Sequence, residues 1–138
     1  MRISEFGPGV ESFKWLPDGK RIVFVHDPAA EPRLGNPLAL GELDLKTSRV
    51  KALAQDEAWD FSGPRYSPDG QQIAAMAAFV GQFHTAHNQL VLIDLQQPRR
   101  ERRVRDALWP GSVEAPLRWS ADAGANYFSA EARGRCHL

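Results

Sequence analysis

Several features that mark other classes of protein are scarce or missing in this 138-residue chain. Its single cysteine, Cys136, cannot form a disulfide within the chain, which argues against a small disulfide-stabilised secreted fold. No apolar run approaches the ~20 residues that a membrane-spanning helix needs. Basic and acidic residues number 17 each, so the formal net charge is zero and provides no general attraction to nucleic acid or to an anionic membrane.

The N-terminus also lacks the basic and then apolar pattern of an export signal. We therefore expect a cytoplasmic protein, or a periplasmic one if such a signal has been removed. What the chain does contain is ordinary globular composition, with 43% hydrophobic and 25% charged residues. This composition argues against disorder, and the length is sufficient for one domain with a real core.

A short turn motif recurs through the chain. Residues 15–19 read Trp-Leu-Pro-Asp-Gly, residues 66–70 read Tyr-Ser-Pro-Asp-Gly, and residues 119–122 read Trp-Ser-Ala-Asp. Proline presets φ, aspartate bonds to nearby backbone and glycine accepts a positive φ, as in a hairpin closed by a turn with a glycine bulge. In the third copy Gly124 comes one position late, which we interpret as an insertion of Ala123. The near-constant step between copies indicates an array of similar units.

Short apolar runs separated by turn signals follow each motif, as expected of strands. The run at 21–25 is apolar on both faces, which predicts a strand buried on both sides between neighbouring sheets. Further strands are predicted at 38–45 and 49–53 in the first unit and at 72–79, 90–95 and 99–105 in the second. In the third unit, a strand after the turn leads to the beginning of another near His137.

Four short antiparallel strands in each unit of about 50 residues match the blade of a β-propeller. We therefore predict an all-β chain that forms a partial β-propeller, with two four-stranded antiparallel blades and an incomplete third. One domain, 1–138, would hold blade units at about 6–54, 55–106 and 107–138. The aromatic residue before each turn is predicted to fill the gap between neighbouring blades. Because closed propellers typically have four to eight blades, the open blade faces need a cover.

The repeat, with its aromatic residue, Pro-Asp-Gly turn, apolar strand and later run ending in Asp-Leu, resembles the PD-type repeats of β-propellers. Such repeats occur in TolB-like proteins and in the N-terminal propellers of the prolyl oligopeptidase family of serine peptidases. The last segment runs from the turn at 119–122 through an aromatic strand and Gly134-Arg135 to His137-Leu138, and is similar to acylaminoacyl- and dipeptidyl-peptidase-type members. The resemblance covers nearly the whole chain from Phe6.

The peptidase resemblance implies a fragment of the propeller that gates a serine peptidase acting on short or N-terminally blocked peptides. In that family the chemistry lies in a separate α/β-hydrolase domain with a Gly-x-Ser-x-Gly motif. This sequence lacks the motif, so no catalytic residue is carried over and the chain itself is expected to be non-catalytic. The alternative is a TolB-like propeller module for protein–protein interaction, and a third is an excised or designed set of blades.

The partners that follow from these hypotheses are of two kinds. They are the missing blades and α/β-hydrolase domain of a longer parent chain, which would bind the peptide substrate, or other copies of this chain in a homo-oligomer. Neither nucleic acid nor a membrane is expected as a partner, and no cofactor or metal is predicted.

Two groups of polar residues could carry chemistry, but each has a simpler structural explanation. His84 and His87, with Asp94 beyond them, lack a third close ligand and match no known metal-site spacing, so a solvated loop is favoured over a metal site. The arginine-rich run at 99–105 has no interleaved aromatic residues. A charged outer strand that protects a sheet edge is therefore favoured over a nucleic-acid site.

The remaining candidates also have a simpler structural explanation than a functional site. Cys136 has no oriented base, because neighbouring His137 would point to the opposite face of a strand. Turn capping explains each of the three turn aspartates, Asp18, Asp69 and Asp122, without a shared carboxylate site. The four tryptophans are expected to pack between blades rather than to stack on a ligand: Trp15, Trp59, Trp109 and Trp119. No catalytic, cofactor-binding or metal-binding residue is assigned.

Overall fold

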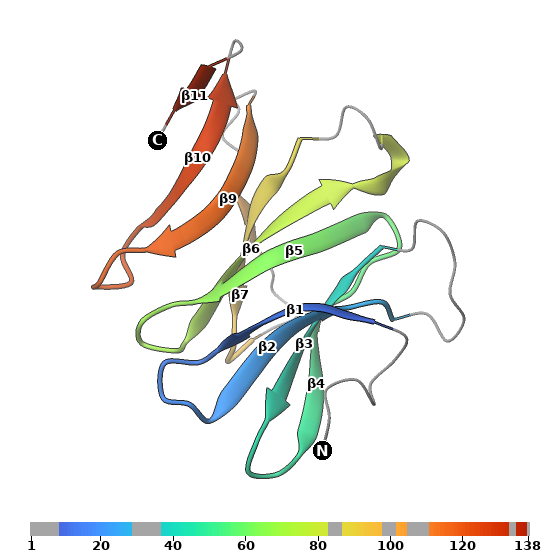
Figure 1. Ribbon diagram of the computed structural model, residues 1–138, viewed down its shortest axis with the longest axis vertical. Coiled ribbons are helices and arrows are strands. Elements are labelled where there is room, and N and C mark those ends of the chain that lie inside the picture. Colours follow the sequence, from blue (N-terminus) through green and yellow to red (C-terminus); the bar gives the residue numbers. More distant parts are fainter. Residues whose placement is uncertain are drawn as a thin grey trace.

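The computed structural model describes residues 9–28, 37–82, 87–97, 102–104, 111–132 and 135–137. These residues form three antiparallel sheets that follow one another in chain order (Figure 1). The predicted all-β partial propeller is confirmed, with two four-stranded sheets and a third sheet of three strands. In the described part of the chain, no helix is long and apolar enough to cross a membrane.

Each sheet is a simple meander, because every strand pairs with its neighbour in the chain. The strand orders are β1-β2-β3-β4, β5-β6-β7-β8 and β11-β10-β9. The bounds are β1 (Val10–Trp15), β2 (Arg21–His26), β3 (Ala39–Asp44), β4 (Arg49–Ala54), β5 (Trp59–Tyr66), β6 (Gln72–Phe79), β7 (Gln89–Asp94), β8 (Arg102–Val104), β9 (Ser112–Trp119), β10 (Asn126–Ala132) and β11 (Arg135–His137), with one 3-10 turn, η2 (Val80–Gln82).

The turn between the first two strands has the same length in all three sheets. The residues paired at its mouth are Trp15 with Ile22, Tyr66 with Ile73 and Trp119 with Asn126. Ala123 has a φ of 59° where Gly19 and Gly70 have 69° and 68°. The interpretation of Ala123 as an insertion is therefore wrong, because this alanine replaces the turn glycine.

The second turn shows how the motif closes a hairpin. Asp69 Oδ1 accepts a hydrogen bond from the Ser67 hydroxyl at 2.5 Å and another from the Gln71 amide at 3.0 Å. Ser67 Oγ in turn accepts the Gln72 amide at 2.9 Å. Both bonds to Asp69 favour the charged carboxylate, with the Ser67 hydroxyl as the larger cause, so the pKa of Asp69 is lowered from 3.8. The predicted capping role of this aspartate is confirmed.

The third turn makes the same bonds despite its altered sequence. The Ser120 hydroxyl donates to Asp122 Oδ1 at 2.6 Å and the Gly124 amide donates to the same oxygen at 3.0 Å, and these two bonds lower the pKa of Asp122. In the first turn, Asp18 Oδ1 accepts an amide two residues further on at 2.9 Å. Leu16 stands there in the place of the serine, so only this turn lacks the hydroxyl.

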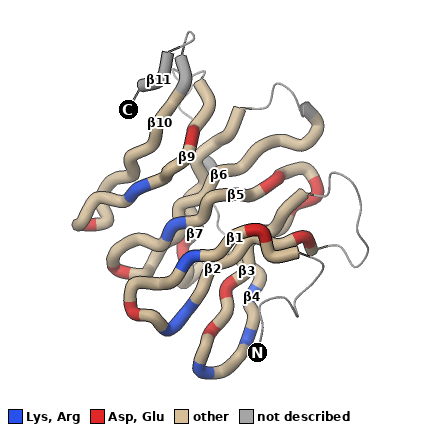
Figure 2. The backbone as a smooth tube through the Cα atoms, viewed as in Figure 1, with Lys and Arg blue, Asp and Glu red and all other residues tan. Residues whose placement is uncertain are grey.

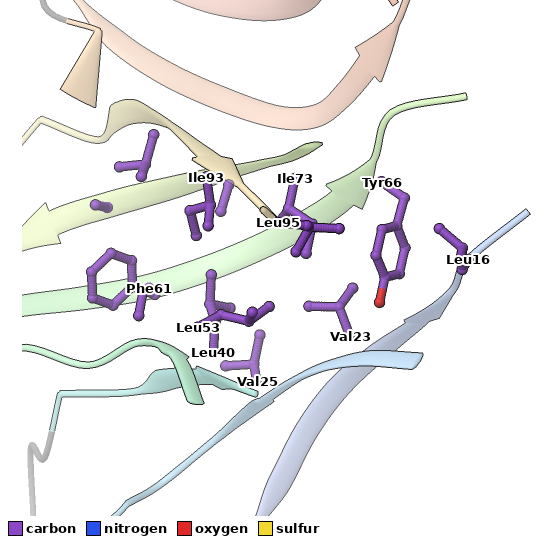
Figure 3. Packing of buried hydrophobic residues seen from close by; sticks show 14 residues of the cluster. Leu16, Val23, Val25, Leu40, Leu53, Phe61, Tyr66, Ile73, Ile93 and Leu95 are labelled. Carbon is purple, nitrogen blue, oxygen red and sulfur yellow. The ribbon is translucent and has the colours of Figure 1, made fainter. Parts of the chain in front are cut away.

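The main core lies between the first and second sheets (Figure 3). Val23 and Val25 of β2 meet Phe61 of β5 and Ile73 of β6, and all four side chains are buried. Leu16 and Tyr66 stand at one end of this core (Figure 3). Ile22 and Phe24, on the other face of β2, are also buried, so the predicted burial of this strand on both faces is confirmed, but a described neighbouring sheet lies against one face only.

A smaller core lies between the second and third sheets. Ala74 and Met76 of β6 and Leu90 of β7 pack there against Val113 and Leu117 of β9. The strand β6 thus faces the first sheet with Ile73 and the third sheet with Ala74, because successive side chains alternate between the faces of a sheet.

Alanine should be tolerated less well at Gly70 than at Gly19. Both positions have a positive φ, but an added methyl group at Gly70 would lie 2.9 Å from Leu16 Cδ1, whereas nothing lies within 4 Å of one at Gly19. We expect Gly19→Ala to lower the free energy of unfolding by about 1 kcal/mol and Gly70→Ala by about 2 kcal/mol or more. Urea unfolding measures both, and equal losses would contradict the packing argument.

Ala123→Gly should stabilise the protein. Glycine removes the strain of the left-handed φ, which costs about 1–2 kcal/mol, and part of this gain is offset by the greater freedom of the unfolded chain. We expect a net gain of about 0.5–1 kcal/mol in the free energy of unfolding, measured by thermal or urea unfolding. The control is Ala125→Gly, outside the left-handed position, which should be destabilising. A loss of stability in Ala123→Gly would contradict the assignment.

Candidate binding surface

The first joint between sheets combines backbone bonds with a buried aromatic side chain. The Phe61 amide donates to the Leu38 carbonyl at 3.1 Å, and the Leu38 amide donates to Asp60 Oδ1 at 2.7 Å. Tyr66, which precedes the second turn, is only 8% exposed and packs in the core shared with the first sheet. The prediction that this aromatic residue fills the gap between blades is confirmed at this joint.

The second joint, between the second and third sheets, repeats the same plan. The Val113 amide donates to the Asn88 carbonyl at 3.0 Å, and the Asn88 amide donates to Ser112 Oγ at 3.1 Å. Trp119, which precedes the third turn, is partly buried against the smaller core, and its indole N–H donates to the Arg65 carbonyl at 3.0 Å. The predicted packing role of this aromatic residue is confirmed as well.

A charged cluster lies inside the first joint. The Tyr66 hydroxyl donates to Glu42 Oε2 at 2.9 Å, and an Arg21 guanidinium nitrogen lies 3.3 Å from the same oxygen. Arg21 also donates to the Gly70 carbonyl at 3.4 Å. Burial, reinforced by the negative charge of Glu42, raises the pKa of Tyr66 well above its ordinary value, so the phenol remains a donor. The only sequence sign of this cluster is a lone glutamate in the apolar run 38–45.

A small cleft of about 70 Å³ opens next to this cluster, between the first and second turns. Its size is far below the roughly 300–1,000 Å³ of typical small-molecule pockets, and it has room for only a few water molecules. The lining residues are Leu16, Pro17, Asp18, Arg21, Pro68, Asp69 and Gly70. This cleft is therefore part of the joint rather than a substrate pocket.

The first sheet also has an aromatic residue before its turn, Trp15, but no described sheet packs against it. Trp15 has the register position of Tyr66 and Trp119, yet 55% of its surface is exposed. The predicted gap-filling role therefore does not hold for Trp15, because no described strand precedes β1. Its face of the sheet is the one opposite the main core.

Two further apolar side chains share the face of Trp15. Val50 lies in the same row of paired residues across the sheet, and Phe13 precedes Trp15 by two positions on β1. Phe13 is 49% exposed and Val50 is 40% exposed. We name the surface formed by Phe13, Trp15 and Val50 the β1 face. It is the most prominent exposed apolar surface in the described part of the first sheet.

The third sheet has a complementary exposed residue at the other end of the array. Tyr127 lies opposite Arg118, in the register position that Val23 and Ala74 occupy in the first two sheets. Those two side chains face the next sheet at the first and second joints. Tyr127 is 55% exposed, and no described sheet follows it. We name this side of the β9–β11 sheet the Tyr127 face.

The sequence-predicted polar candidates that lie among the described residues do not form a metal-binding group. His84 lies outside the described residues, His87 is exposed, and Asp94 is exposed at the end of β7. Cys136 lies in β11 opposite Glu131. Within the described ranges, no three side chains of the metal-binding types form a cluster.

The remaining candidates have structural positions. Of the arginine-rich run 99–105, the described part is β8 at the outer edge of the second sheet, as predicted for an edge strand. Trp59 packs against the main core and meets Phe79 edge-on, with ring centroids 5.4 Å apart. Trp109 lies outside the described residues.

No protein-family model matches the chain, and no curated protein matches it. Similar solved structures include TolB from Acinetobacter baumannii, with a TM-score of 0.67 and 21% identity over 93% of this chain. They also include a putative TolB from Agrobacterium tumefaciens, with a TM-score of 0.57 and 18% identity over 85% of this chain. The fold is that of a TolB-like β-propeller. The chain spans 28% and 36% of those two proteins, so it corresponds to part of such a propeller.

Tyr66→Phe should destabilise the first joint. The change removes one of the two donors to buried Glu42, which should cost about 1–2 kcal/mol of unfolding free energy. In combination with Glu42→Gln, the loss should be smaller than the sum of the two single losses, because the two residues are bonded to each other. Urea unfolding of the four proteins measures this coupling. Tyr127→Phe is the matched control, and a loss as large as that of Tyr66→Phe would contradict the assignment.

Proposed function

We propose that this chain is a non-catalytic, TolB-like propeller module that works by protein–protein contacts through its β1 face. The observation that supports the proposal is the exposure of Phe13 and Trp15. Both have about half of their surface exposed, whereas Tyr66, which is equivalent to Trp15, is buried at a joint. Exposed aromatic side chains grouped on one surface are typical of the residues that dominate protein–protein interfaces.

The chemistry of the polar groups agrees with a binding module. Glu42 and Tyr66 connect two sheets, and Asp69 and Asp122 close turns. Perturbed pKa values often mark catalytic sites, but here each shift has a local structural cause. These groups stabilise the array that holds the β1 face in place.

The substrate-gating propeller of a serine peptidase is the other hypothesis drawn from the sequence. It rests on the resemblance of the segment 117–138, part of which lies outside the described residues. The similar solved structures named above are TolB proteins, which favours the interaction module. We therefore do not assign a peptidase substrate to this chain.

Photo-crosslinking from inside the β1 face tests this function. The full chain, carrying p-benzoylphenylalanine at position 13 or 50, is irradiated in the cells that produce it, and adducts are identified by mass spectrometry. The matched controls carry the same group at Lys46 or Gln96, which are exposed outside this face. We expect polypeptide adducts at 13 and 50 in at least about tenfold higher yield than at the control positions, because apolar interface centres exclude water. Equal yields at all four positions would contradict the proposal.

A further inference from the structure

We infer that the protein bound at the β1 face is a second copy of this chain, which docks through the Tyr127 face of its third sheet. This inference rests on the proposed function, since it names the partner of the same surface. Its basis is the pair of joints inside the molecule, because they show which surfaces of two neighbouring sheets pack against each other.

Each internal joint has two different halves. The later sheet contributes the aromatic residue before its turn, Tyr66 or Trp119. The earlier sheet contributes the face that carries Val23 or Ala74 on its second strand. The β1 face corresponds to the half that carries Tyr66 or Trp119, but no described sheet packs against it. The Tyr127 face corresponds to the half that carries Val23 or Ala74, and no described sheet packs against it either. The two exposed surfaces of one chain are therefore complementary to each other.

The second joint provides the template for the new contact. There the Trp119 indole N–H donates to the carbonyl of Arg65, the residue before the preceding aromatic. Arg118 holds the position of Arg65 in the third sheet. By this equivalence the Trp15 indole N–H donates to the Arg118 carbonyl of the second copy, and Trp15 packs beside Tyr127 of that copy.

The third sheet has strands in the two places that form the earlier side of the second joint. At the second joint, the earlier sheet contributes Ala74, Met76 and Leu90 to the buried cluster, all from β6 and β7. In the third sheet, β10 and β11 hold the places of these two strands.

The pattern of charge along the first strands is the same in all three sheets. Each first strand carries one cation immediately before the aromatic residue of the turn: Lys14, Arg65 and Arg118. Figure 2 shows these cations as one blue band on each of β1, β5 and β9. β5 packs against both β1 and β9, so both internal joints already place two such strands side by side. A joint that brings Lys14 near Arg118 of a second copy repeats this pattern.

Because the two halves differ, the contact is heterologous, and such contacts form either a closed ring or an open chain of copies. Three described sheets in each of two copies make six, which is within the four to eight blades of typical closed propellers. We therefore expect a ring of two copies with two identical new joints, in which no β1 face or Tyr127 face stays exposed.

Analytical ultracentrifugation of charge variants tests the inference. The unmodified chain should sediment at twice the 15.4 kDa of one copy. Trp15→Glu and Tyr127→Glu should each weaken self-association by at least about tenfold, since a buried unpaired charge at an interface centre is costly. An equimolar mixture of the two variants should form a heterodimer, because one intact β1 face and one intact Tyr127 face remain. Lys46→Glu is the control and should sediment like the unmodified chain, with circular dichroism confirming that all variants are folded.

Three results would overturn the inference. They are a monomeric unmodified chain, a dimer that Trp15→Glu breaks but Tyr127→Glu leaves intact, and a mixture of the two variants that does not associate. The second result would indicate two β1 faces in contact with each other. If the crosslinks at positions 13 and 50 lead to a different protein, this inference fails while the proposed function stands.

Discussion

The second strands of the first two sheets bury apolar side chains against a neighbouring sheet, β2 at the first joint and β6 at both joints. Full burial of one large apolar side chain contributes about 1.5–3 kcal/mol, so β2 and β6 alone provide much of the driving force for stacking. The residues that join the sheets, Tyr66, Trp119 and the hydrogen-bonded pair Phe61 and Leu38, stabilise this stacking. Each sheet therefore buries its apolar side chains against a neighbouring sheet in the array.

The two joints satisfy the same requirement with different chemistry. Leu92 in the second sheet holds the register position that Glu42 has in the first. A tyrosine at the first joint therefore meets a buried carboxylate and donates to it, whereas Trp119 at the second joint donates to a backbone carbonyl. Tyrosine and tryptophan both have an apolar ring with one polar group. At each joint the ring fills the gap between the sheets, and the O–H or N–H donates to an acceptor beside it.

Much of the fold was predictable because the repeat has a clear physical meaning. The spacing of the turns, the apolar run at 21–25 and the aspartates of the turns predict the sheets, their stacking and their caps. The left-handed φ of Ala123 was not predictable, because a glycine adopts a positive φ more readily and Gly124 is adjacent. The strand register, which pairs Asn126 with Trp119, places Ala123 at that position of the turn. The candidate binding surface was harder to predict from the sequence. Trp15 has the same sequence context as Trp119, and its exposure depends on which sheets lie next to it.

The Arg21–Glu42–Tyr66 cluster was also beyond prediction from sequence. Its members lie in β2, β3 and β5, and no local pattern relates residues so far apart. The arginine and the glutamate come together because β2 and β3 pair in one register, and the tyrosine reaches them only once the second sheet has stacked on the first. Such long-range contacts follow from topology rather than from propensity or spacing.

The unequal size of the two cores has a consequence for how the molecule opens. Among the described residues, fourteen buried side chains form the core of the first joint and five form that of the second. In a linear array, stability is close to a sum of unit and nearest-neighbour contributions, so partial opening starts at the weaker boundary. From these described cores we expect the third sheet to detach at lower free energy than the first, and the amide protons of β9 and β10 to exchange before those of β2 and β6. The second sheet, which takes part in both boundaries, is the last unit to lose its protection.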